Sequence, residues 1–178
     1  MDPSFANRFF ALVTVLILVA DAGLLAVLIG RRGVLRRAGE WLDAVLGGAT
    51  LWLAWVVAAG ALGGSLFYSE IVGFQPCQLC WYQRFAWYPL VVVLLIAAIR
   101  HSSRVGMWAL PLVAIGWGLS VYHYTIQLFP SLDAGACNAE VPCTARWIWE
   151  FGFVSIPLMS FAGLTLVGLL LLLARKNT

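Results

Sequence analysis

The chain has 178 residues, of which 62% are hydrophobic and only 11% are charged. Soluble domains carry roughly a quarter charged residues, so this composition excludes an ordinary soluble protein. The net charge of +3 does not indicate nucleic-acid binding, because the basic residues are distributed around long apolar segments in the pattern of a membrane topology.

Five apolar segments are predicted to span a membrane as helices. They cover residues 9–30, 46–67, 85–99, 107–129 and 153–174. The third is short, and Trp81 and Tyr82 are expected to extend it into the headgroup layer. The first is longer than the apolar core of a usual secretory signal and ends without a clear small-residue cleavage site. We therefore interpret it as a retained helix.

The basic residues fall mainly on one side of these segments. Eight of the eleven follow the first, third and fifth segments: Arg31, Arg32, Arg36, Arg37, Arg100, Arg104, Arg175 and Lys176. The positive-inside rule makes that side cytoplasmic. The N-terminus and all four cysteines are then expected to face outward, where dithiols can remain oxidised.

Two features of the N-terminal part have more than one interpretation. Asp21 lies in the middle of the first apolar segment, where a carboxylate is a candidate functional group. The alternative is a side chain that stays protonated or bonds to a neighbouring helix. Residues 30–43 form a basic connection, which predicts a helix on the membrane surface with Trp41 at the interface.

The cysteines form two pairs of different spacing. Cys77 and Cys80 follow Pro76, and this order favours a helix that starts near Cys77. The helix N-terminus and Arg84 are expected to favour a thiolate at Cys80.

The second pair, Cys137 and Cys143, lies in residues 130–150, a stretch with two prolines and a glycine that is predicted to be irregular. One fixed dithiol and one in a loop indicate an electron relay.

Other interpretations of these residues stay open. The two pairs could hold zinc or form purely structural disulfides. Arg84 could simply reach the lipid headgroups from a helix end. A thioredoxin-like domain is excluded, because no βαβ pattern surrounds the Cys-x-x-Cys.

Residues 77–84, Cys-Gln-Leu-Cys-Trp-Tyr-Gln-Arg, resemble the signature of the DsbB family of membrane thiol oxidases, and in particular its BdbC-type branch. The similarity extends over about residues 46–174. It includes Tyr68-Ser69-Glu70, Val141-Pro142-Cys143-Thr144, Phe151-Gly152-Phe153, Ile156-Pro157, and His123 four residues before Gln127.

The resemblance implies an enzyme of the bacterial cell membrane that reoxidises a DsbA-like thioredoxin-fold protein and passes the electrons to a quinone, either ubiquinone or menaquinone. It also implies roles for six residues. The partner attacks Cys137, the released Cys143 attacks Cys77, Cys80 reacts with the quinone, and Arg84 and His123 lie beside the quinone oxygens.

The expected fold is an all-α membrane protein: a four-helix bundle of the DsbB type in residues 44–178, preceded by an additional helix and basic connection in residues 1–43. The family bundle has no counterpart of that first helix. A quinone reductase of the VKOR type is an alternative, but in that family the loop pair precedes the Cys-x-x-Cys. A non-enzymatic membrane protein with structural disulfides or zinc is another.

Overall fold

The computed structural model describes residues 3–30, 33–135, 137 and 141–176. Its helices are α1 (Pro3–Gly30), α2 (Arg36–Leu46), α3 (Thr50–Leu66), the π-helical turn η1 (Phe67–Ile71), α4 (Gln78–Ile99), α5 (Ser103–Met107), α6 (Leu110–Leu128), the 3-10 turn η2 (Pro130–Leu132) and α7 (Ile156–Lys176). Within these residues the only β-type pairing is an isolated bridge between Glu150 and Val154.

Five helical stretches are long and apolar enough to cross a membrane, as the sequence predicts. They are Ser4–Gly30, Thr50–Ile71, Gln78–Ile99, Ser103–Leu128 and Ile156–Arg175. The third, expected to be short, reaches 22 residues because its helix begins before Trp81 and Tyr82. The predicted all-α architecture with an additional N-terminal helix is confirmed.

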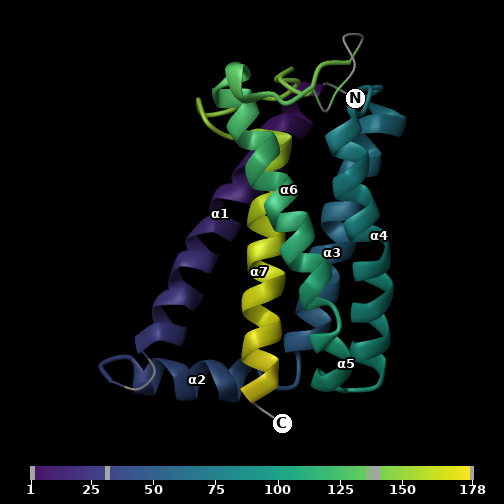
Figure 1. Cartoon of the computed structure of the whole chain (residues 1–178). Helices are drawn as coiled ribbons and strands as arrows, with labels where there is room; N and C mark the ends of the chain where they lie inside the picture. Colours follow the sequence, from purple (N-terminus) through teal and green to yellow (C-terminus); the bar gives the residue numbers. More distant parts are fainter. Residues whose placement is uncertain (1–2, 31–32, 136, 138–140, 177–178) are drawn as a thin grey trace.

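Helices α3, α4, α6 and α7 form the bundle, and α1 leans against it from outside (Figure 1). Helix α7 packs against α1, α3 and α6. The core includes Leu90, Leu94, Leu164 and Leu171, all of them buried. A Cβ on Gly116 would lie 3.1 Å from Leu164, so this glycine allows α6 and α7 to approach closely.

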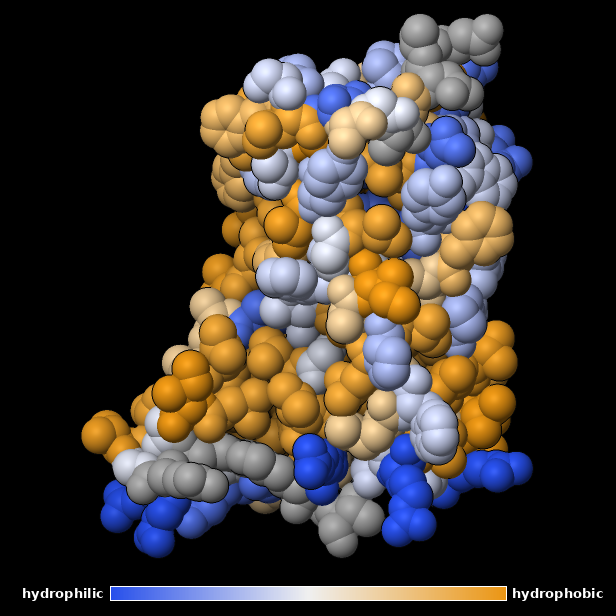
Figure 2. Space-filling model, in the orientation of Figure 1, coloured by the Kyte–Doolittle hydropathy of each residue, from blue (hydrophilic) through white to orange (hydrophobic). Residues whose placement is uncertain are grey.

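The two ends of the bundle differ in charge. The N-terminus and both cysteine segments lie at one end, whereas α2, α5 and the C-terminus lie at the other (Figure 1). Hydrophilic side chains project from that second end (Figure 2), where the helix ends and connections carry Arg36, Arg37, Arg100, Arg104 and Arg175. The predicted cluster also includes Arg31 and Arg32, which lie outside the described residues.

Helix α2 runs across the ends of α1 and α7, with Trp41 exposed (Figure 1). The basic connection contains a helix, as predicted, but that helix spans Arg36–Leu46 and not residues 30–43.

Candidate functional site

Cys77 and Cys80 lie at the first turn of α4. Cys77 is the N-cap residue, with φ −70° and ψ 172°, and its sulfur accepts a hydrogen bond from the Cys80 backbone N–H at 3.3 Å. The sequence-based expectation that the helix N-terminus acts on the Cys80 sulfur is therefore wrong. An N-cap side chain turns back over the free N–H groups of the first turn, whereas a side chain three residues later points along the helix surface.

Cys77 and Cys80 are called the helix pair below, because both lie at the start of α4. Their sulfurs lie 2.8 Å apart, and both cysteines are free. Cys77 is buried, and Cys80 is partly buried. The hydrogen bond with the Cys80 thiol lowers the pKa of Cys77 most, burial opposes that change, and His123 lowers the pKa further. A thiolate at Cys77 is thus stabilised by direct partners.

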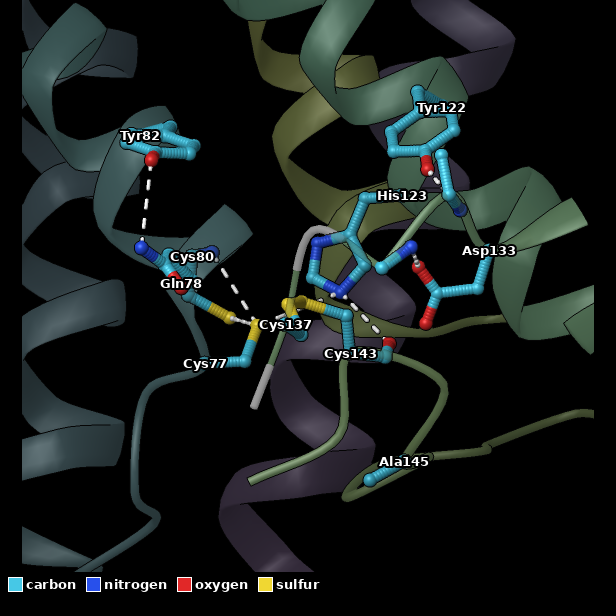
Figure 3. Close-up of a disulfide and its surroundings, with 12 residues drawn as sticks. Cys77, Gln78, Cys80, Tyr82, Tyr122, His123, Asp133, Cys137, Cys143 and Ala145 are labelled. Atoms are coloured by element: carbon cyan, nitrogen blue, oxygen red, sulfur yellow. Dashed lines mark hydrogen bonds between the residues drawn. A yellow bond between two sulfur atoms is a disulfide. The ribbon is translucent and has the colours of Figure 1, made fainter. Parts of the chain in front are cut away.

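Cys137 and Cys143 form a disulfide in the loop above the bundle. The Cys77 sulfur lies within 4.8 Å of both loop sulfurs (Figure 3). Cys77 and Cys143 also belong to one buried apolar cluster with Leu79 and Ile126. The two dithiols therefore meet through Cys77, and only a small loop movement separates them from the sulfur contact that exchange requires.

His123 of α6 lies beside both pairs (Figure 3). Its Nε2 is 3.7 Å from the Cys77 sulfur and 3.2 Å from the Cys143 carbonyl oxygen. Its Nδ1 has no hydrogen-bond partner in the described part of the chain. An imidazole in this position can exchange a proton with the Cys77 thiol.

The upper end of α6 holds the cysteine loop at two points. The Tyr122 hydroxyl accepts a hydrogen bond from the Ala134 N–H at 3.1 Å. The Gln127 side chain donates from Nε2 to the Ala145 carbonyl at 3.1 Å, and the Gln127 backbone carbonyl accepts from the Arg146 guanidinium. Arg146 also lies 4.1 Å above the Trp149 ring. These bonds fix the chain on both sides of the loop disulfide.

A cavity of about 330 Å³ lies on the other side of Cys80. Its lining comes from α1, α3, η1, α4 and α7: Phe9, Phe10, Val13, Thr14, Ile17, Val56, Val57, Gly60, Ala61, Gly64, Ser65, Tyr68, Cys80, Gln83, Arg84, Trp87, Ile156, Met159, Ser160 and Gly163. Its volume falls within the range of small-molecule sites, about 300–1,000 Å³. Cys80 lines this cavity, whereas Cys77 does not.

Arg84 also lines the cavity, and it is only 4% exposed. It donates from Nε to the Ser65 hydroxyl at 3.0 Å and from Nη2 to the Ser65 carbonyl at 2.7 Å. Its guanidinium lies 5.3 Å from the centre of the Trp81 ring. The alternative that Arg84 reaches the headgroups is therefore not observed, because the side chain is held inside the bundle.

His123 lines a smaller cavity with Cys77 and Cys80, and not the large one. The two residues predicted to bind a quinone thus lie on different sides of the helix pair.

Asp21 lines neither cavity. It is 6% exposed, and its carboxylate has no hydrogen-bond partner among the residues that the structure describes. The alternative of a bond to a neighbouring helix is not observed there.

The side chains of Cys77, Cys80 and His123 offer two sulfurs and a nitrogen within 4.8 Å of one another, a set that can hold a metal ion. The zinc alternative needs both cysteine pairs as thiolates. In the observed state Cys137 and Cys143 are joined to each other, so they offer no thiolates.

The sequence analysis assigned no role at the site to several polar side chains that lie near it. Gln83 donates to the Ser120 hydroxyl at 3.0 Å, Ser120 contacts Ser160 at 3.1 Å, and the Trp87 indole N–H donates to Ser160 at 3.1 Å. Tyr68 is buried, and its hydroxyl has no partner among the described groups. Polar residues inside apolar helices are the signal that could have identified them.

Comparisons with known proteins identify the family of the chain. The sequence model of the family described as "Disulfide bond formation protein DsbB" matches residues 47–174. The chain is 46% identical over 119 residues to "Probable disulfide formation protein C 2" of Bacillus cereus (strain ATCC 10987 / NRS 248), covering 67% of this chain and 86% of the relative.

It is 42% identical over 118 residues to "Disulfide bond formation protein C" of Bacillus subtilis (strain 168), covering 66% of this chain and 86% of the relative. No solved structure matches the chain significantly. The family match covers the bundle and both cysteine pairs, and five apolar helices accompany it. The chain is therefore a multi-pass membrane protein that belongs to the DsbB family of disulfide bond formation proteins.

Proposed function

We propose that this protein is a thiol oxidase that takes two electrons from a soluble thioredoxin-fold dithiol partner of the DsbA type and passes them to a membrane quinone. The observation that carries the proposal is the position of the helix pair between two environments. Cys77 faces the loop disulfide, whereas Cys80 lines a cavity inside the bundle. Electrons that enter at the loop can leave only through the helix pair.

The thiol chemistry balances in two exchanges. In the first, a partner thiolate attacks Cys137, and the partner leaves with its own disulfide while Cys137 and Cys143 become thiols. In the second, Cys143 attacks the Cys77 sulfur of an oxidised helix pair and releases Cys80. Cys137 then resolves the mixed disulfide, so the loop pair is oxidised and the helix pair carries both electrons. The bonding pattern in the structure corresponds to that last state.

Two buried side chains support these steps. His123 is close enough to the Cys77 sulfur to receive its proton when the thiolate forms. The Arg84 guanidinium supplies a fixed positive charge in the lining of the Cys80 cavity, where a reduced acceptor gains negative charge. Ser65 holds that guanidinium by two hydrogen bonds, which keeps its direction fixed.

The cavity fits a quinone in its distribution of polarity. Ser65, Tyr68 and Arg84 line it near the ends of α3, η1 and α4 that adjoin the Cys77 segment, whereas Ile17 and Val57 line it from the middle of α1 and α3. The buried Tyr68 hydroxyl, which has no partner in the described structure, can donate to a ring oxygen. A bound quinone would supply the oxidising potential, because it accepts two electrons and two protons.

The charge asymmetry supports an orientation with both cysteine pairs outside the cytoplasm. The end of the bundle opposite the cysteines carries Arg36, Arg37, Arg100, Arg104 and Arg175. Such residues stay on the cytoplasmic side. Disulfide formation in exported proteins needs the loop pair on the other side, where thiols are not held reduced.

The proposal is tested by mixing the fully reduced protein with a soluble quinone analogue without oxygen, while quinone absorbance and free thiols are followed together. With four cysteines in two pairs, we expect two quinones to be reduced as the four thiols disappear. Zinc content is measured on the same sample as a control. Thiols that persist in the presence of every quinone analogue, with stoichiometric zinc bound, would contradict the proposal and favour the metal site.

A further inference from the structure

The cavity beside Cys80 has a wall that lies outside the family match. The match begins at residue 47, whereas α1 ends at Gly30. Five cavity-lining residues nevertheless belong to α1: Phe9, Phe10, Val13, Thr14 and Ile17. The cavity is therefore bounded in part by α1, a helix outside the four-helix bundle.

The packing of α1 explains why a space remains there. Helix α1 packs closely against α7 but makes few backbone contacts with α3. The cavity occupies the gap between α1 and α3, where the lining of α3 includes Gly60, Ala61 and Gly64. Small residues on one side and a separate helix on the other leave room for a ligand in place of side chains.

Phe10 lines this gap beside Gly64 and Tyr68. A Cβ on Gly64 would lie 3.1 Å from the Phe10 ring, so the glycine accommodates that ring. The centre of the ring is 5.4 Å from that of Tyr68 and 6.1 Å from that of Phe67. These contacts seat α1 at a defined position on α3 and η1, which indicates a built wall and not a loosely attached anchor.

The cavity is also elongated along the membrane normal. Its lining on α3 and η1 runs from Val56 to Tyr68, a length of about 18 Å at 1.5 Å per residue. On α1 it runs from Phe9 to Ile17 beside the same stretch. The outward face of α1 is exposed, with Leu16 at 69%, so α1 stands between this part of the cavity and the outer surface of the protein.

We infer that α1 forms the outer wall of the acceptor site, with Phe10 lining it beside Tyr68, and Val13 and Ile17 contacting the apolar tail of the acceptor. The inference rests on the proposed function and adds a binding element to it. The ligand is a lipid-soluble acceptor with a flat polar ring and an isoprenoid tail. Because α1 encloses that tail, it sets both the affinity for tail-bearing quinones and the selection among them.

The direct test is photolabelling of the unchanged, full-length protein in lipid vesicles with two quinone probes. One carries an azide on the ring, and the other carries a diazirine on the first isoprene unit. We expect the tail probe to label the peptide that contains Val13 and Ile17, together with the α3 peptide around Val57. Excess unlabelled quinone should prevent both.

A matched pair of substitutions on α1 tests the same wall by affinity. Val13→Trp fills the cavity, whereas Leu16→Trp adds the same bulk on the exposed face. Titration with a radiolabelled short-chain quinone should show Kd raised by about ten-fold or more for Val13→Trp. The Kd of Leu16→Trp should stay within about two-fold. Circular dichroism compares the folding of both variants with the unchanged chain.

Two outcomes separate this inference from the proposed function. If the reduced protein reduces quinone but the tail probe labels only peptides of α3, α4 and α7, the wall is refuted and the oxidase remains. If neither probe labels any peptide and no electrons reach quinone, both the role of α1 and the proposed oxidase function are contradicted. The photolabelling uses no variant, so it decides the matter even if Val13→Trp fails to fold.

Discussion

The two cysteine pairs occupy different kinds of structure. Cys137 and Cys143 lie in an irregular loop that is held at its two sides by Tyr122 and Gln127. Cys77 and Cys80 are fixed in the first turn of a 22-residue helix. A loop can move toward a protein partner, whereas a helix end keeps its sulfurs at one place beside a cavity.

The two cysteines of the helix pair face different parts of the molecule. Cys77 is the cysteine near the loop sulfurs, and Cys80 is the cysteine in the lining of the large cavity. In the proposed function, the pair as a whole is the junction between an exchange that needs motion and a transfer that needs fixed geometry. Each of the following substitutions acts on one side of that junction.

The largest effect is expected from serine substitution in the helix pair. Cys77→Ser leaves the loop disulfide able to oxidise one partner molecule per chain, after which turnover stops, because no sulfur near the loop can receive the electrons. Cys80→Ser also stops turnover, but its Cys77 thiol remains able to attack the loop disulfide. Peptide mapping should therefore find a disulfide between Cys77 and a loop cysteine only in Cys80→Ser. Sustained turnover in either variant would break the division between the two cysteines.

A smaller effect is expected at the cavity side. Arg84→Ala removes the buried charge and its bonds to Ser65, and should raise the apparent Michaelis constant for quinone about ten- to a hundred-fold. Arg84→Lys keeps the charge but loses the planar pair of donors, so its apparent Michaelis constant for quinone should lie between those of the unchanged protein and Arg84→Ala. Steady-state assays with varied quinone measure this. An unchanged constant in Arg84→Ala, or an equal loss in the first exchange with partner, would remove Arg84 from the acceptor site.

The smallest effect is expected at the loop side. Gln127→Ala removes one hydrogen bond that holds Ala145 next to Cys143, at a cost of about 1 kcal/mol. The exchange between the two pairs should slow by about five-fold, because Cys143 spends less time near Cys77. Attack of the partner on Cys137 should keep its rate. Rapid quenching with an alkylating reagent separates the two steps, and a slower first step would mean that Gln127 acts on the partner instead.

The sequence predicted those parts of the site that depend on local order along the chain. The five apolar segments are confirmed, as is a helix start near Cys77 after Pro76: α4 begins at Gln78, with Cys77 as its N-cap residue. Arg84 falls in the lining of the Cys80 cavity because four residues complete about one helical turn. The identity of the sulfur over the helix N-terminus was predicted wrongly, because a spacing of three does not say which residue is the N-cap.

Contacts between residues far apart in the chain could not be predicted from the spacing of residues in the sequence. His123 stands beside Cys77, 46 residues earlier, and Gln127 holds Ala145, 18 residues later. The contribution of Phe10 and Val13 to the cavity depends on how α1 is seated on α3 and α7. None of these contacts leaves a periodic signal in the chain.

By itself, the sequence determined that this membrane protein has five segments long and apolar enough to cross the bilayer, with one cysteine pair at a helix end and one in a loop. Hydrophobic length, basic residues and proline act over one or two helical turns, so their effects are visible in the linear order. Only the tertiary structure decided that Cys77 faces the loop while Cys80 faces the cavity, and that the first helix encloses that cavity. Those arrangements depend on the packing of helices far apart in the chain, where small residues such as Gly64 set which surfaces can meet.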